Sequence, residues 1–306
     1  MDTPELPDKP IQSRRAVFFQ RAMSTLILWV LVAGALALES QLLFSVLIVV
    51  IGTLALLEFL GLLKLEGTPG WPGIRWGLAV VAVAYLGAVS FVCSKGEYTT
   101  LALLDPSCLV AVVLGTTFLL LFHPVDGKRT KDMFFGTVFG FVYTVILSSF
   151  LLRVLYFTAG DNGAGVAVAG QYYLLFLLVV TKFSDMGGYI VGTMIGRHKM
   201  IPHISPGKTW EGFILGCLVF SVAGGCAVFA MFGERMPLLT WPHVVMLGFV
   251  LGIIAVVGDL AESIVKRCLA RKDSGHMLPG IGGVLDLVDS ILFTAPVLFF
   301  YLKAIS

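Results

Sequence analysis

Long apolar runs alternate with short polar segments along almost the whole chain. Each run holds about 20 residues with few charges, which is the length that an α-helix needs to cross the hydrocarbon core of a bilayer. The pattern therefore predicts an all-α polytopic membrane protein. Nine runs are predicted to be helices, of which the fourth is the shortest: Val17–Leu38, Leu42–Leu63, Ile74–Cys93, Ser107–Phe122, Met133–Leu152, Gln171–Ile195, Gly212–Phe232, His243–Val265 and Val284–Ile305.

The composition supports the same fold class. Charged residues make up 13% of the chain, against about 25% in a soluble domain. Hydrophobic residues make up 58%, and the mean hydropathy is +0.94. These values indicate that the lipid bilayer is the solvent of this protein. The formal net charge of +2 is too small to indicate a nucleic-acid partner.

The positions of lysine and arginine predict which segments face the cytoplasm. With the N-terminus inside, sixteen of the 21 basic residues fall in inner segments, four in outer segments and one, Lys182, within a helix. Cytoplasmic loops carry the excess of these residues in membrane proteins. Nine helices then leave the N-terminus in the cytoplasm and the C-terminus outside. We expect the membrane to be a bacterial cytoplasmic membrane.

The chain is predicted to have one membrane domain. Residues 1–15 are polar and rich in proline, and we expect a disordered cytoplasmic tail there. Residues 16–306 form the domain, with N-terminal helices over 16–170 and catalytic helices over 171–306. This division follows from the segments that break the apolar pattern with groups suited to chemistry, since all of them lie in the second part.

The most polar of these segments joins the last two apolar runs. On the upstream run Asp259, Glu262 and Lys266 are spaced by three and four residues, so one helix face carries them. On the downstream run Asp286 and Asp289 are three apart and also share a face. Four acids on two adjacent helices would repel each other in a low dielectric, and a divalent cation with nearby lysines would offset that repulsion. The oxygen-only ligand set is typical of Mg²⁺ or Mn²⁺.

A second polar interruption, TKFSDMGGY, lies inside the sixth run. Lys182 and Asp185 are one helical turn apart, so they could pair and offset part of the cost of burying them. Two interpretations stay open. The pair is either a structural salt bridge, or it borders a polar cavity in which Ser184 and Asp185 contact substrate or metal.

A third polar segment, RHKMIPHISPGKTWEG, follows the sixth run on the predicted inner side. Gly207 frees the backbone before Lys208 and Thr209, and Ser205 or Thr209 could cap the next helix. A lysine and free amides at a helix N-terminus would form a phosphate-binding site. An ordinary basic inner loop is the alternative interpretation of this segment taken alone.

Together these segments resemble a known family. The pattern S-I-V-K-R-x₄-K-D-S-G-x₂-L-P-G-I-G-G-V-L-D-L-V-D, at Ser263–Asp289, is similar to the signature of CDP-diacylglycerol synthases, also called phosphatidate cytidylyltransferases. Ile281 and Leu287 stand where many members have histidine and arginine. Three further segments are family-like: Ser184–Tyr189, Ser205–Gly212 and Gly258–Ser263.

The resemblance implies that CTP and phosphatidate react to give CDP-diacylglycerol and pyrophosphate, with Mg²⁺ as cofactor or Mn²⁺ in its place. Asp259 and Asp286 would hold the metal, and Asp289 would orient lysines or a second cation. The implied catalytic residues are Asp259, Asp286, Asp289 and Lys266. The implied substrate-binding residues are Ser184, Asp185, Ser205, Lys208, Thr209, Ser263, Arg267, Lys272, Asp273, Gly282 and Gly283.

The expected partners are CTP, phosphatidate and the bilayer, with the active site on the cytoplasmic side and no nucleic acid. The oligomeric state stays open, with a homodimer among the alternatives. Two other functions share some of these features. A CTP-dependent polyprenol or lipid kinase would use similar spans but would transfer the γ-phosphoryl group and release CDP. A secondary transporter is disfavoured, because the acids cluster at the inner end and the first half offers only Glu58.

Overall fold

Eight helices of the computed structural model are long and apolar enough to cross a bilayer, counted over the residues that it describes. These residues are 29–65, 67–68, 70–157, 169–269 and 283–306. The protein is therefore an all-α polytopic membrane protein, as predicted. Of the first predicted helix, Val17–Leu38, residues 29–37 are described as helical. Its earlier part and the predicted tail at 1–15 lie outside the described residues.

The helices follow one another with short connections. The first half contains α2 (Gln41–Leu62), α3 (Trp71–Ser94), α4 (Tyr98–Leu121), α5 (Gly127–Gly140), the π-helical η1 (Phe141–Ile146) and α6 (Leu147–Leu155). The second half contains α7 (Ala169–Ile195), β1 (Lys199–Ile201), β2 (Ser205–Thr209), the π-helical η2 (Gly212–Leu218), α8 (Val219–Phe232), the 3₁₀ turn η3 (Gly233–Arg235), α9 (Trp241–Cys268) and α10 (Val284–Ile305). The elements from α5 to α6 form one continuous span, as do those from η2 to η3.

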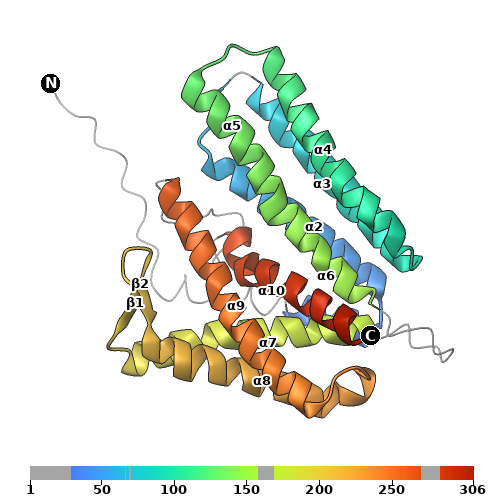
Figure 1. The fold of residues 1–306 in the computed structure, drawn as a ribbon, viewed down its shortest axis with the longest axis vertical. Coiled ribbons are helices and arrows are strands. Elements are labelled where there is room, and N and C mark those ends of the chain that lie inside the picture. The colour runs from blue at the N-terminus through green and yellow to red at the C-terminus, as the bar shows by residue number, and fades with distance from the viewer. Residues whose placement is uncertain (1–28, 66, 69, 158–168, 270–282) are drawn as a thin grey trace.

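Helix α10 lies at the centre of this arrangement. Figure 1 shows α2 to α6 as one group and α7 with α8 as a second group that lies across its end. Helix α10 packs against α9 and α7 from the second half and against α2 and α6 from the first. The start of α10 is therefore placed by contacts with both halves of the chain.

Two glycines let α7 and η2 approach until their backbones touch. A Cβ atom added at Gly216 would lie 2.3 Å from the carbonyl oxygen of Gly187, and one added at Gly187 would lie 2.5 Å from that of Gly216. Both distances are too short for any side chain, so only glycine fits at the crossing. This close contact fixes the end of α7 relative to the helix that follows the hairpin.

A partly buried ion pair joins α4 to α6 in the first half. Nη2 of Arg153 lies 2.6 and 2.7 Å from the two carboxylate oxygens of Asp105, and the Tyr85 hydroxyl donates to the same carboxylate at 2.8 Å.

The predicted start of the fourth helix was wrong, because α4 begins at Tyr98 rather than at Ser107. The predicted run began after Asp105, because a charged residue lowers the local hydropathy. The contacts with Arg153 and Tyr85 allow Asp105 to lie within the span. The expectation that Glu58 is the only acid within the spans of the first half is therefore wrong, because Asp105 and Asp132 also lie within them.

The segment after α7 forms a β-hairpin instead of the predicted loop. β1 and β2 pair antiparallel, with Lys199 opposite Thr209 and Ile201 opposite Ser205. Such short strands leave no clear alternation in the sequence, which is why the pattern did not show them. Oγ1 of Thr209 accepts a hydrogen bond from the Gly212 N–H at 3.2 Å. Of the two predicted capping residues, Thr209 is therefore the one that caps.

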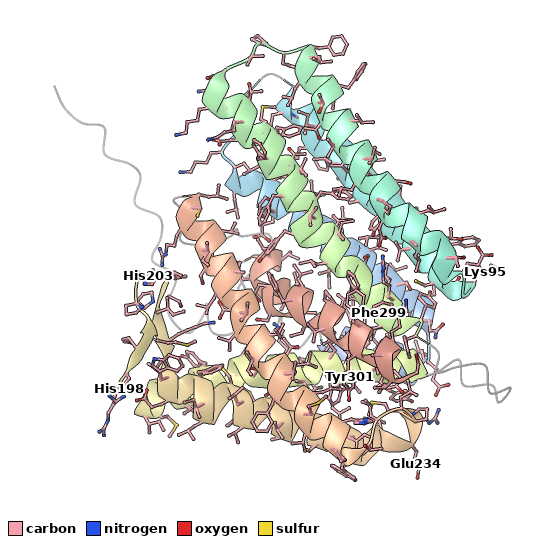
Figure 2. All side chains as sticks on the ribbon, in the orientation of Figure 1. Lys95, His198, His203, Glu234, Phe299 and Tyr301 are labelled. Atoms are coloured by element: carbon pink, nitrogen blue, oxygen red, sulfur yellow. The ribbon has the colours of Figure 1, made fainter. Side chains whose placement is uncertain are left out.

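Glu211 ties down the base of the hairpin. Its carboxylate accepts from the backbone N–H of Arg197 at 3.1 Å and of His198 at 3.2 Å, and it lies 2.5 Å from Nδ1 of the His198 ring. That ring lowers the pKa of Glu211 to about 2. Figure 2 shows His198 and His203 on the hairpin, beyond the helix ends, where both are exposed.

Candidate active site

Lys266 connects the end of α9 to the start of α10. Its Nζ lies 3.1 Å from Oε2 of Glu262, one turn earlier on α9, and 3.1 Å from Oδ1 of Asp286 on α10. The Glu262 side chain is only 3% exposed, so a carboxylate there without a cation would be costly. The lysine therefore neutralises a buried acid and holds two helices together.

Asp286 also closes the first turn of α10. Its Oδ2 accepts from the Gly283 N–H at 3.2 Å, as an acid in the third position of a helix commonly does. The negative charge at this end suits the helix dipole. The two oxygens of Asp286 thus contact Lys266 and the start of its own helix. The sequence predicted a metal ligand here, and that role stays a prediction.

A second pair of contacts joins α7 to α10. Nζ of Lys182 lies 3.5 Å from Oδ2 of Asp185 and donates to the carbonyl oxygen of Leu287 at 2.7 Å. The Ser290 hydroxyl donates to Oδ1 of Asp185 at 3.3 Å. The predicted pairing of Lys182 with Asp185 is confirmed. The backbone carbonyl of Leu287 is a further partner of Lys182 and joins this pair to α10.

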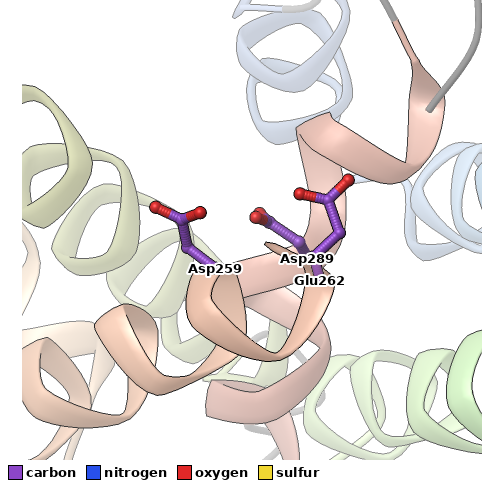
Figure 3. Close-up of side chains that lie close together, drawn as sticks. All are labelled: Asp259, Glu262 and Asp289. Carbon is purple, nitrogen blue, oxygen red and sulfur yellow. The ribbon is translucent and has the colours of Figure 1, made fainter. Parts of the chain in front are cut away.

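Three carboxylates from α9 and α10 meet beside these contacts (Figure 3). One oxygen each from Asp259, Glu262 and Asp289 lies within 4.8 Å of the others. Glu262 and Asp289 are buried, and Asp259 is half-buried. Three carboxylate oxygens are the kind of ligand that Mg²⁺ or Mn²⁺ prefers. We call these residues the carboxylate cluster. Of the two predicted metal ligands, Asp259 and Asp286, the cluster contains only Asp259. Its other two members are Glu262 and Asp289.

A cavity of about 310 Å³, lined by both polar and apolar side chains, opens next to the carboxylate cluster. Asp259 belongs to both. The walls come from α7, the hairpin, η2 and α9, which are far apart in the sequence. Five residues of the predicted site line this cavity: Asp185, Ser205, Lys208, Thr209 and Asp259.

Lys208 brings the hairpin to α9. Its Nζ lies 2.8 Å from Oδ2 of Asp259 and donates to the Val256 carbonyl oxygen at 3.2 Å. Arg267, near the end of α9, donates from Nε to the carbonyl oxygen of Ile204 at 3.4 Å. The hairpin is therefore fixed over α9 at both positions, with a lysine inside the cavity.

The remaining predicted residues divide into two groups. Ser184 is fully buried on α7 and does not line the cavity. Ser263 is half-buried on α9, and Gly283 directly precedes α10. Outside the described residues lie three predicted substrate-binding positions and one of the two departures from the family pattern: Lys272, Asp273, Gly282 and Ile281.

One contact between the two halves of the chain was not predicted from the sequence. Glu58 on α2 is buried and accepts a hydrogen bond from the Leu285 N–H at 3.0 Å. The sequence showed a lone acid inside an apolar run, which is the signal for a functional or paired group in a membrane. Nothing in the pattern identified its partner, because the two residues are 227 positions apart.

Comparison with known proteins gives a consistent result. The model of the cytidylyltransferase family matches residues 19–305. The uncharacterized protein YnbB of Escherichia coli is 31% identical over 252 residues, which cover 76% of this chain and 80% of that protein. The phosphatidate cytidylyltransferase of Bacillus subtilis is 32% identical over 275 residues, covering 89% and 93%. That of Mycobacterium leprae is 38% identical over 162 residues, 53% of this chain and 47% of the relative, so this match spans about half of it.

Proposed function

Because this chain belongs to the cytidylyltransferase family, we propose that it is an integral-membrane phosphatidate cytidylyltransferase, which joins CTP and phosphatidate into CDP-diacylglycerol and releases pyrophosphate. The observation that carries the proposal is the position of Asp259, which belongs to the carboxylate cluster and also lines the cavity that holds Lys208. A site for a nucleotide triphosphate needs both kinds of group together.

The cavity is the proposed binding site for the nucleotide. Its volume of about 310 Å³ is at the lower end of ligand sites in proteins. Lys208 supplies a positive charge, while Ser205 and Thr209 supply hydroxyl groups along β2. The walls also include Tyr189 and Phe213, which offer apolar surface to a base. Together these groups suit a molecule with an anionic end and a flat, less polar end.

The carboxylate cluster is the proposed metal site. Asp259, Glu262 and Asp289 would hold Mg²⁺, with Mn²⁺ as the alternative. A divalent cation bound there would neutralise phosphate oxygens and make the α-phosphorus more electrophilic. Lys266 contributes a further positive charge on the same side of α9.

The proposed step is an in-line displacement at the α-phosphorus of CTP. A phosphate oxygen of phosphatidate forms the new P–O bond, while the bond to the β-phosphate oxygen breaks and pyrophosphate leaves with the electron pair. No covalent protein intermediate is needed. Lys208 and Lys266 would stabilise the negative charge that moves onto the leaving group, and the fixed hairpin would align the two substrates.

The side of the membrane follows from the substrates. CTP is a cytosolic polyanion, so the hairpin end of the molecule would face the cytoplasm and phosphatidate would enter from the adjoining leaflet. The basic residues at this end support that orientation, among them Arg197, Lys199 and Arg267.

The test uses purified protein in detergent with phosphatidate, Mg²⁺ and CTP labelled in the α-phosphate. Transfer of label into the lipid phase is the expected result. Label that stays in the aqueous phase as CDP would indicate the lipid kinase. The Asp259→Asn variant should remain folded and transfer almost no label, since it alters the residue shared by the cluster and the cavity. Turnover at the wild-type rate in this variant would contradict the assignment of the site.

A further inference from the structure

Glu58 makes a contact that crosses from the first half of the chain to the catalytic half. It lies near the C-terminal end of α2, inside a membrane span, and is 4% exposed. Its Oε2 accepts from the Leu285 N–H, in the first turn of α10, at 3.0 Å. A carboxylate in an apolar span is costly, so a specific interaction is needed to keep it there.

The start of α10 needs an acceptor from outside its own sequence. The first N–H groups of a helix have no partner within it, and a side chain at the N-cap usually accepts from the second or third. The N-cap of α10 is Gly283, which has no side chain. Asp286 accepts from the Gly283 N–H. The N–H of Leu285, at the second position of the helix, is bound by Glu58 instead.

We propose that Glu58 is a positioning residue for the reaction, which caps α10 from another helix and thereby holds Asp286 and Asp289 in place. Both acids lie within the first two turns after the capped residue. Asp286 must reach Lys266, and Asp289 must stay within 4.8 Å of Asp259 and Glu262. A small displacement of this turn would disturb both contacts at once. The catalytic part of the inference rests on the proposed function.

The contact also gives the first half of the chain a role in the reaction. The walls of the cavity come from α7, the hairpin, η2 and α9, all in the second half, and no described residue of the first half lines it. Through Glu58, α2 acts on the site without touching substrate. The negative charge of Glu58 beside the start of α10 also suits the helix dipole.

The experiment compares Glu58→Ala with Glu58→Gln, because glutamine keeps an acceptor oxygen and removes only the charge. Each protein, in lipid nanodiscs, is assayed for hydrogen exchange of the backbone amides over 284–290 and for kcat and KM. The Ala variant should exchange faster at Leu285 and lose roughly tenfold in kcat, as expected when a cap is lost. Its KM for CTP should change little, since the nucleotide cavity does not contact α2. The Gln variant should restore both readouts most of the way to wild type.

The matched control is Thr53→Ala, also on α2. Thr53 is buried and donates only within its own helix, to the carbonyl oxygen of Val49, so this change should leave exchange at Leu285 and kcat as in the wild type. Unchanged exchange and kcat in Glu58→Ala would overturn the inference. So would a Gln variant as impaired as the Ala variant, because capping would then not explain the effect. If the wild type transferred no label, the proposed function would fall, and the exchange data would still decide whether Glu58 caps α10.

Discussion

At the scale of single residues, the site depends on how each charge is paired. Lys266 lies between Glu262 and Asp286, and Lys208 lies against Asp259. Each lysine contacts an acid of the carboxylate cluster and leaves the remaining acid, Asp289, next to Asp259. The pairing keeps several carboxylates close together in a membrane span without leaving them bare.

The first prediction separates two assignments of the metal ligands. Asp289→Asn should lower the affinity for Mn²⁺ by at least roughly a hundredfold. Loss of a group that only hydrogen-bonds to a metal ligand lowers the affinity by at most about that factor, so loss of a ligand should have a larger effect. Asp286→Asn should weaken it much less, because Asp286 contacts Lys266 and the start of α10. Binding is measured from the electron paramagnetic resonance signal of free Mn²⁺, without nucleotide.

The control for this comparison is Glu234→Gln, at the opposite end of the molecule from the hairpin (Figure 2). It should bind Mn²⁺ as the wild type does. If Asp286→Asn abolished binding and Asp289→Asn did not, the pair predicted from the sequence, Asp259 with Asp286, would be the correct assignment.

The second prediction concerns the buried charge of Glu262. Replacing Lys266 with Met should lower the free energy of unfolding by about 3 kcal/mol, because it leaves a buried carboxylate without its cation. The double variant Glu262→Gln with Lys266→Met should recover part of that loss. Thermal unfolding in detergent measures both. Equal stability of wild type and Lys266→Met would mean that Glu262 does not depend on this lysine.

At the scale of elements, the hairpin is the part of the site that the apolar pattern did not reveal. It brings Lys208 and Thr209 to α9 and is anchored at its base by Glu211. Since η2 starts directly after it and touches α7 through glycine, the hairpin has fixed attachments on both sides. Its strands are short, so these attachments rather than the sheet hold its position.

The third prediction is a pH dependence of this anchor. The pKa of Glu211 is lowered from 4.5 to about 2 in the folded protein, so the unfolded state takes up a proton at higher pH than the folded state. The stabilisation is therefore complete above about pH 4.5 and is lost as the pH falls toward about 2. Hydrogen exchange of the hairpin, compared between wild type and Glu211→Gln at each pH, should differ above this range and converge below it. A difference that persists at the lowest pH would contradict the role of the charge.

At the scale of the whole molecule, α10 links the two halves of the chain. It packs against α2 and α6 on one side and against α7 and α9 on the other. Within the first half, the ion pair of Asp105 with Arg153 holds α4 to α6. Glu58 connects this half to α10. The first half thus serves as a frame for the helices that carry the proposed site.

The fourth prediction concerns orientation. In a Cys268→Ser background, which removes an exposed thiol, Lys95→Cys should react with a membrane-impermeant maleimide added to intact cells, whereas His203→Cys should not. The two positions lie at opposite ends of the molecule (Figure 2). After the membrane is made permeable, both should react. Labelling of His203→Cys alone in intact cells would reverse the predicted orientation.

The sequence by itself determined the membrane class, six of the spans to within three residues, and the polar segments that meet in the site. Apolar runs and charged interruptions are local features of the chain, so they can be recognised in the amino-acid sequence. The start of α4 was not predicted correctly, because Asp105 is stabilised within the span by Arg153, which is 48 residues away in the sequence. The same reason applies to every pairing between helices.

Only the tertiary structure decided which charges face one another. The spacing placed Asp286 and Asp289 on one face of α10, but the crossing of α9 and α10 put Asp289 with Asp259 and Glu262 and put Asp286 on Lys266. It likewise joined Glu58 to Leu285. Coulomb energies and hydrogen bonds act over a few ångströms in space, and the distance between two side chains on different helices is set by packing rather than by their separation in the chain.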